Sequence, residues 1–236
     1  MLNPLELTGR ARTHVVQRDD LRAALHAAVL EPFLEMKADA ARAGIDIRIT
    51  SGFRDFAAQQ RIWDCKFRGE RPLYDAEGLA LDHASLVPEE LVQAILCWSA
   101  LPGASRHHWG SELDVVDAAA MPEGYRVQLA PAEAAPGGVF HALHGWLDAH
   151  LTRYGFFRPY RSARNGVSPE PWHLSYAPVS APALEALSPA LLADAIAASD
   201  MLGRDLVLGR IEELHGRYVA NVDPPAGEPP DDRRIV

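Results

Sequence analysis

One short segment, Ser105-Arg-His-His-Trp-Gly-Ser-Glu-Leu-Asp114, constrains the fold more than any other part of this chain. In this segment a glycine lies between a histidine and a carboxylate, and the apolar residues Val115 and Val116 follow. A glycine at such a position lets the backbone double back, and the apolar run predicts a strand. The segment therefore predicts a strand that carries Asp114 and a turn that returns a histidine toward it.

The alternation of side chains along this strand indicates which way Asp114 points. Leu113 and Val115 are expected in the core, so Glu112 and Asp114 should face the other side. We expect Glu112 to be a solvated acid, with a place around a metal site as the alternative.

Two adjacent histidines, His107 and His108, compete for the position opposite Asp114. Neighbouring side chains in an extended segment point apart, so only one of them can reach a common site. From the residues alone, the choice between them stays open.

A second segment, Glu170-Pro-Trp-His173, supplies another histidine with a glutamate three residues ahead of it. Prolines on both sides of Glu170 disfavour a regular strand there, which predicts that Glu170 lies on a loop just before the strand that carries His173. Two histidines and one aspartate suit a hydrolytic zinc, because three protein ligands leave a fourth position for water. A glutamate that is not a ligand can then accept a proton from that water.

Arg54 follows an expected strand and precedes an expected helix, a corner where side chains often face a cleft. Its planar guanidinium could bind a carboxylate or stabilise an oxyanion, and Gln59 could add a hydrogen-bond donor. The alternative for Arg54 is an ion pair on the surface.

The remaining periodicities predict an α+β fold in which helices flank a small, mainly antiparallel sheet. The helices are expected at 17–43 (with Pro32 kinking or dividing it), 55–67, 88–99, 139–154, 181–198 and 203–219. The strands are expected at 45–49, 113–116, 155–160 and 172–176. A long loop is expected at 118–138, with a short strand at 125–129.

We expect three parts along the chain: a catalytic domain at 1–180, a C-terminal helical extension packed on it at 181–221, and a disordered tail at 222–236. The tail is expected because proline and charged residues dominate its composition.

Composition excludes several classes of partner. The net charge of −9 does not favour nucleic acid or an anionic membrane as a partner, and no stretch reaches the ~20 apolar residues of a membrane span. No secretory signal is visible at the start of the sequence, which favours a cytoplasmic location. Cys65 and Cys97 are too few for a disulfide framework or a cysteine-based zinc site, and both are expected to be buried free thiols. The oligomeric state is left open.

Three segments together resemble the motifs of the zinc D-alanyl-D-alanine carboxypeptidases of the VanY type, in the LAS group of peptidoglycan metallopeptidases. They are Ser51-Gly-Phe-Arg54 with Gln59, Ser105-x-His107-x-x-Gly110-x-x-x-Asp114, and Glu170-Pro-Trp-His173. The resemblance implies zinc held by His107, Asp114 and His173, with Glu170 as the general base. It also implies that Arg54 polarises the scissile carbonyl or stabilises the oxyanion, and that Ser105 and Gln59 bind the terminal carboxylate of the substrate. The sequence departs from the family at Glu112, where an alanine is common.

The activity implied is hydrolysis of a C-terminal D-amino acid, D-alanine, from peptidoglycan-type peptides, with periplasmic or cell-wall action as the family's usual setting. The alternatives are a cytoplasmic D-Ala-D-Ala dipeptidase, an L,D-carboxypeptidase and an endolysin-like endopeptidase. A zinc-stabilised binding module is the non-enzymatic alternative, and the presence of Glu170 argues against it because a structural metal needs no base.

Overall fold

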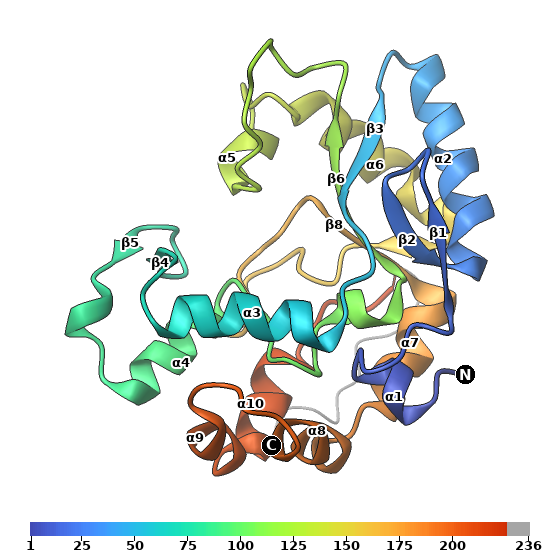
Figure 1. Ribbon diagram of the computed structural model, residues 1–236. Coiled ribbons are helices and arrows are strands. Elements are labelled where there is room, and N and C mark those ends of the chain that lie inside the picture. The colour runs from blue at the N-terminus through green and yellow to red at the C-terminus, as the bar shows by residue number, and fades with distance from the viewer. Residues whose placement is uncertain (226–236) are drawn as a thin grey trace.

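The computed structural model describes residues 1–225, and at its centre is a four-stranded antiparallel sheet (Figure 1). The strands lie in the order β3 (Ile47–Ser51), β6 (Glu112–Asp117), β8 (His173–Tyr176) and β7 (Phe156–Phe157). The register pairs Asp114 with Ser51 on one side and with His173 on the other. The predicted α+β class with a mainly antiparallel sheet is confirmed, and the register brings the two histidine segments side by side.

Both faces of the central strand β6 are covered, since all six of its residues are buried. Leu113 and Val115 pack into a core with α2 (Leu30–Arg42), α6 (His141–His150) and the 3₁₀ turn η4 (Leu151–Tyr154). Alternation along β6 turns Glu112 and Asp114 the other way. The apolar face of the strand therefore anchors it, while the opposite face carries the acids.

The prediction of a single helix over 17–43 was wrong in its first half. That half forms a hairpin of β1 (Val15–Arg18) and β2 (Ala23–His26), followed by the 3₁₀ turn η1 (Ala27–Val29) and then α2. Backbone bonds from Phe53 N to Ala24 O and from His26 N to Gly110 O hold β2 against distant segments, which a helix could not do. Pro32 lies in the first turn of α2, where a backbone N–H is not needed, so it neither kinks nor divides the helix.

A second hydrophobic core lies below the sheet in Figure 1, between α3 (Phe56–Phe67), α4 (Pro88–Leu96) and the C-terminal helices. Those helices are α7 (Ala177–Ala186), α8 (Pro189–Ala197), α9 (Arg204–Leu208) and α10 (Ile211–Tyr218). Each of the two long helices expected there is divided: Ser188 caps a new helix ahead of Pro189, and the chain turns at Gly209 and Arg210. Because these helices share one core with α3 and α4, they pack firmly on the rest of the molecule. The domain boundary at 180 stays a prediction.

The shorter elements fill the remaining connections. They are α1 (Pro4–Leu7), β4 (Leu73–Tyr74), β5 (Ala80–Leu81), η2 (His83–Ser85), η3 (Arg106–Trp109) and α5 (Pro131–Ala134). The strand expected at 125–129 is not formed. Instead the carboxylate of Glu133 accepts hydrogen bonds from the Tyr125 hydroxyl and from the backbone N–H groups of Gln128 and Ala130, so these donors need no strand partner.

The start of the expected tail is also ordered. Asp223 is buried, and its carboxylate accepts hydrogen bonds from the backbone N–H groups of Arg161 and Ser162 and from the Ser162 hydroxyl. Asp223 is thus held against the segment around Arg161, the boundary at 222 stays a prediction, and the rest of the expected tail lies outside the described residues. Cys65 and Cys97 are free, as expected, but only partly buried.

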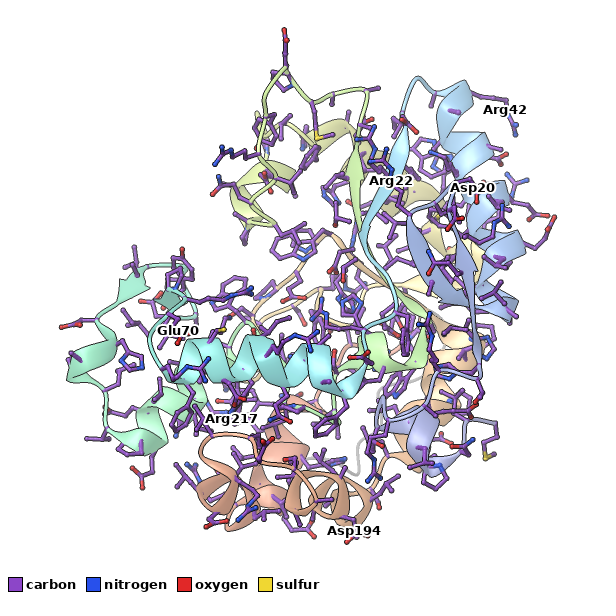
Figure 2. The ribbon with its side chains drawn as sticks, in the orientation of Figure 1. Asp20, Arg22, Arg42, Glu70, Asp194 and Arg217 are labelled. Carbon is purple, nitrogen blue, oxygen red and sulfur yellow. The ribbon has the colours of Figure 1, made fainter. Side chains whose placement is uncertain are left out.

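Exposed charges of both signs are spread over the surface. Figure 2 labels six of them: Asp20 and Arg22 in the turn between β1 and β2, Arg42 at the end of α2, Glu70 after α3, Asp194 in α8 and Arg217 in α10. Within residues 1–225 no single helix is long and apolar enough to cross a membrane; α7 and α8 meet that test only as a pair, with a bend of 78° between them.

Candidate metal centre

The structure brings His107, Asp114 and His173 together at one point. His107 Nε2 lies 3.3 Å from Asp114 Oδ2, and His173 Nδ1 lies 3.1 Å from Asp114 Oδ1. One candidate ligand atom from each of the three residues lies within 4.8 Å of the others, and all three residues are buried. Two imidazole nitrogens and a carboxylate oxygen at this spacing can bind a single divalent ion.

A tight turn presents His107 to the sheet. The residue lies in η3, which ends at Gly110 with a φ of 65°. A Cβ at Gly110 would lie 2.5 Å from Val15 Cγ1 and 2.8 Å from His26 N. Only glycine fits there, because the left-handed backbone and the hairpin packed against it leave no room for a side chain.

Hydrogen bonding determines which nitrogen of His107 faces the metal position. His107 Nδ1 lies 2.9 Å from Gly52 O, and because a carbonyl can only accept, Nδ1 carries the proton. Burial lowers the pKa of His107, which favours the neutral ring. Nε2 is therefore left with a free lone pair facing Asp114.

His108 points into the protein interior. Its Nδ1 donates to Arg54 O at 2.6 Å, and its Nε2 accepts from Gly103 N at 3.1 Å. Both ring nitrogens are engaged, and burial lowers the pKa of His108 to about 3. The geometry thus favours His107 over His108 at the position opposite Asp114.

Glu112, expected as a solvated acid, is fully buried and binds His173, so that expectation was wrong. Its Oε2 accepts a hydrogen bond from His173 Nε2 at 2.9 Å. Its carboxylate also accepts from Ser175 Oγ at 2.8 Å and from the Arg106 guanidinium at 3.3 Å. Burial opposes ionisation of Glu112, but the charge of Arg106 and the bond to His173 outweigh it and lower the pKa to about 2. A buried carboxylate that fixes the second nitrogen of a histidine is a common support for a metal ligand.

The electrostatics of the centre favour a cation. Burial lowers the pKa of His173, but the carboxylates of Asp114 and Glu112 outweigh it and raise the pKa to about 10. Asp114 stays ionised despite its burial, because the two histidines hold its pKa below the ordinary value. Its Oδ1 is buried and receives no well-formed hydrogen bond. An unsatisfied anionic oxygen between two imidazoles fits the position of a metal ligand.

Glu170 lies on the loop before β8, as expected, beside the three ligand residues. Its Oε2 is 3.6 Å from His173 Nδ1, and its side chain is 14% exposed. Burial raises the pKa of Glu170 to about 7. A carboxyl group that exchanges a proton near neutral pH suits a general acid and base.

The centre opens into a cleft with a volume of about 440 Å³, whose wall includes Arg54, Ser105 and Glu170. Arg54 donates from Nη1 to Gln59 Oε1 and from Nη2 to Ser51 Oγ, both at 2.8 Å. Gln59 is 1% exposed, and its Nε2 donates a hydrogen bond to Ala100 O. The structure therefore places Arg54 and Ser105 at the cleft, whereas Gln59 lies behind Arg54 and holds it in place.

Two neighbours of the centre were not singled out from the sequence. The ring of Tyr160 packs edge-on against His173, with centroids 5.1 Å apart. Arg106 stacks over Trp109, with its guanidinium carbon 4.8 Å from the ring centroid, while it pairs with Glu112. Glu112 was singled out by its position two residues before Asp114, but only as an alternative to a solvated acid. The partners that make it functional come from other parts of the chain.

The sequence matches a protein-family model described as VanY, D-alanyl-D-alanine carboxypeptidase, over residues 22–179. A Haemophilus influenzae protein described as uncharacterized is 35% identical over 121 residues, which cover 50% of this chain and 92% of that protein. A D-alanyl-D-alanine carboxypeptidase of Enterococcus faecalis is 31% identical over 156 residues, 64% of this chain and 48% of that protein. The chain thus spans about half the length of the enterococcal relative.

Two solved structures share the fold at a TM-score of 0.50 each. VanYB in complex with D-alanine-D-alanine is 23% identical, with 73% of this chain and 81% of that chain covered. A mutant of the vancomycin-resistance D,D-pentapeptidase VanY in complex with Zn(II) is 24% identical, with 74% and 83% covered. The family match spans more than half of the chain and contains every residue of the metal centre. The protein therefore belongs to the VanY family of D-alanyl-D-alanine carboxypeptidases.

Proposed function

We propose that this protein is a zinc-dependent carboxypeptidase that releases a C-terminal D-amino acid, D-alanine, from peptidoglycan-type peptides. The observation that carries the proposal is the convergence of His107, Asp114 and His173 within 4.8 Å, with the Glu170 carboxylate 3.6 Å from His173 Nδ1. Membership of the family supports the reaction class. One solved structure with the same fold is a complex with Zn(II) and another is a complex with D-alanine-D-alanine. These bound groups support zinc as the metal and a D-alanyl peptide as the substrate.

Zinc suits the donor atoms of the site. His107 Nε2, the Asp114 carboxylate and His173 Nδ1 would hold the ion and leave a fourth position for water. When bound, zinc supplies Lewis acidity and lowers the pKa of water toward neutrality. Glu112 and the Gly52 carbonyl fix the two imidazoles from behind, so the ligand set needs little rearrangement to bind the ion.

Glu170 would move the proton during hydrolysis. Its carboxylate faces the ligand residues from the cleft wall and would accept a proton from the attacking water. As the carbon–oxygen bond forms and the carbon–nitrogen bond breaks, Glu170 would return that proton to the leaving amine.

Arg54 would act on the scissile carbonyl. Negative charge builds on the carbonyl oxygen as the water attacks, and a fixed guanidinium stabilises that charge. Gln59 Oε1 and Ser51 Oγ each accept a hydrogen bond of 2.8 Å from the Arg54 guanidinium, so the orientation of Arg54 is set before the substrate binds. Ser105, on the same cleft wall, would contact the terminal carboxylate.

The test measures zinc content and D-alanine release on the purified protein. The substrates are the dipeptide D-Ala-D-Ala, a muropeptide tetrapeptide ending in D-alanine and a pentapeptide ending in D-Ala-D-Ala. We expect one equivalent of zinc and release from the pentapeptide. Release from the dipeptide alone would indicate a dipeptidase, release from the tetrapeptide alone an L,D-carboxypeptidase, and cleavage without D-alanine an endopeptidase. Zinc binding without hydrolysis of any substrate would contradict the proposal and indicate a binding module.

A further inference from the structure

The backbone, rather than a hydrogen bond to the carboxylate, sets the position of Glu170 in the cleft. Within residues 1–225 no donor forms a hydrogen bond with the Glu170 carboxylate, and His173 Nδ1 lies 3.6 Å from its Oε2. That distance is too long for a hydrogen bond. The place of this carboxylate therefore depends on how firmly the chain around Glu170 is held.

Two prolines make this part of the chain stiff. Pro169 and Pro171 flank Glu170, and the ring of each proline fixes its own φ. A residue that precedes a proline is also restricted to extended conformations. Because such a segment moves as a unit, a contact to one of its residues also fixes the others.

Three hydrogen bonds anchor the backbone of Glu170 and Pro171. Glu170 N donates to Tyr160 O at 2.9 Å, and His173 N donates to Glu170 O at 3.2 Å. The third bond comes from a side chain, since Arg158 Nε donates to Pro171 O at 2.8 Å. In the described part of the chain, Arg158 is the one side chain that bonds to the backbone of either residue.

Arg158 is itself fixed on its other side by α6. Its Nη1 bonds to the Asp148 carboxylate, and its Nη2 donates to His144 Nδ1 at 3.3 Å. Burial and the charge of Arg158 lower the pKa of His144 to about 4, so the ring is neutral and can accept this bond. The Arg158 side chain is 8% exposed. Each nitrogen of the planar guanidinium thus has a partner, which restricts the group to one orientation.

The helix α6 gives Arg158 a rigid base. His144 and Asp148 are four residues apart, so they are neighbours on one face of the helix. Leu143 and Leu147 are fully buried in the same core as β6, the strand of the candidate aspartate ligand. One helix therefore packs in the core of β6 and holds the loop before β8 through Arg158.

We propose that Arg158 is a positioning residue that holds the Glu170 carboxylate beside the candidate metal ligands, through the carbonyl of Pro171. The inference rests on the proposed function, in which Glu170 accepts the proton of the attacking water. Arg158 does not line the cleft, so it acts through Glu170 and not on the substrate.

The test compares Arg158→Met with Arg217→Met. Methionine keeps much of the apolar stem of arginine and removes the guanidinium. Arg217, labelled in Figure 2, is the matched control, because its Nε donates to Asn165 O at 2.6 Å. This is the same kind of bond to the same loop between β7 and β8, but it lies outside the cleft.

A second variant, Arg158→Lys, keeps the inference testable should Arg158→Met fail to fold. Its ammonium keeps a positive charge beside Asp148, but it lacks the fork that bonds to Asp148, His144 and the Pro171 carbonyl at once. We expect the same direction of change in both variants at Arg158.

Kinetics are measured as D-alanine release from whichever of the three peptides the wild-type protein hydrolyses. Arg158→Met should lower kcat by about 10- to 100-fold, since a small displacement of a reacting group is enough for such a loss. KM and zinc content should stay at wild-type values, and Arg217→Met should keep kcat. A wild-type kcat in Arg158→Met, a change in KM alone or a loss of zinc would overturn the positioning role.

Amide exchange, followed by NMR on the metal-free protein, tests the inference without turnover. The amide protons of Glu170 and His173 are hydrogen-bonded in this segment and should exchange about tenfold faster in Arg158→Met than in wild type or Arg217→Met. The amides of β3 should keep their wild-type rates. Equal exchange in all three proteins would overturn the inference, and so would faster exchange throughout the sheet.

The two measurements separate this inference from the proposed function. If the wild-type protein hydrolyses none of the peptides, the proposed function fails, and the amide exchange still decides whether Arg158 holds the Glu170 segment. If the wild-type protein and Arg158→Met hydrolyse a peptide equally well, the positioning role alone fails.

Discussion

Glu112 Oε2 lies 2.9 Å from His173 Nε2, and this contact turns Nδ1 of the same ring toward Asp114, 3.1 Å away. The position that is often alanine in the family thus carries a buried acid that orients a ligand. Ser175 and Arg106 hold the carboxylate in turn. The candidate metal centre therefore has a support on the same face of the sheet as Asp114 that the ligand motif alone does not describe.

Replacing Glu112 by glutamine should weaken zinc binding. The amide removes the charge that holds the His173 ring, and loss of such a support typically lowers metal affinity by about 10- to 100-fold. Competition with a chromogenic chelator measures the dissociation constant. Glu133→Gln is the matched control: Glu133 is also a buried acid with three hydrogen bonds, but it lies in the 118–138 loop. Equal affinity of Glu112→Gln and wild type would contradict the supporting role.

Replacing Glu170 by glutamine should abolish hydrolysis while the protein keeps its zinc. The amide cannot accept a proton, and loss of a general base typically costs about 10²- to 10⁴-fold in rate. Metal analysis of the purified variant should give the wild-type zinc content, and D-alanine release should fall to the level of the blank. Turnover at the wild-type rate would remove Glu170 from the mechanism.

The adjacent histidines should respond differently to alanine. His107→Ala should lose zinc, since it removes a candidate ligand. His108→Ala should keep its zinc, but unfold more easily by about 1–3 kcal/mol, because it leaves Arg54 O and Gly103 N without their partner in the interior. Zinc content and urea denaturation of both variants check this pair of outcomes. Loss of zinc by a folded His108→Ala protein would reverse the assignment.

The stability of the metal-free protein should depend on Glu170 and pH. Burial raises the pKa of Glu170 from 4.5 to about 7. The folded state therefore keeps a proton that the unfolded state releases between these values. The resulting stabilisation is fully present below pH 4.5 and is lost as pH rises through 7, by up to about 3 kcal/mol.

Glu170→Gln is neutral at every pH and should not show this loss. In the presence of a chelator, the variant should gain stability over wild type between pH 5 and pH 8, as measured by urea denaturation. Titrating groups far from Glu170 are common to both proteins and cancel in the difference. A difference that stays constant between the two pH values would show that Glu170 does not titrate in this range.

The sequence alone determined the sheet class, the strand that carries Asp114 and the place of Glu170 on a loop before β8. These features depend on local rules: alternation along a strand, a glycine at a turn, and proline beside a strand. The residues that define each feature are close together in the chain, so the local sequence pattern is enough to predict it.

Tertiary structure decided what the local rules could not. Residues 15–26 form a hairpin because the backbone of β2 bonds to Phe53 and Gly110, although their spacing suits a helix. Glu112 is a buried support because Arg106, His173 and Ser175 surround it. In both cases hydrogen-bond partners that are far apart in the sequence stabilise the polar groups. Only the folded chain brings these partners within bonding distance.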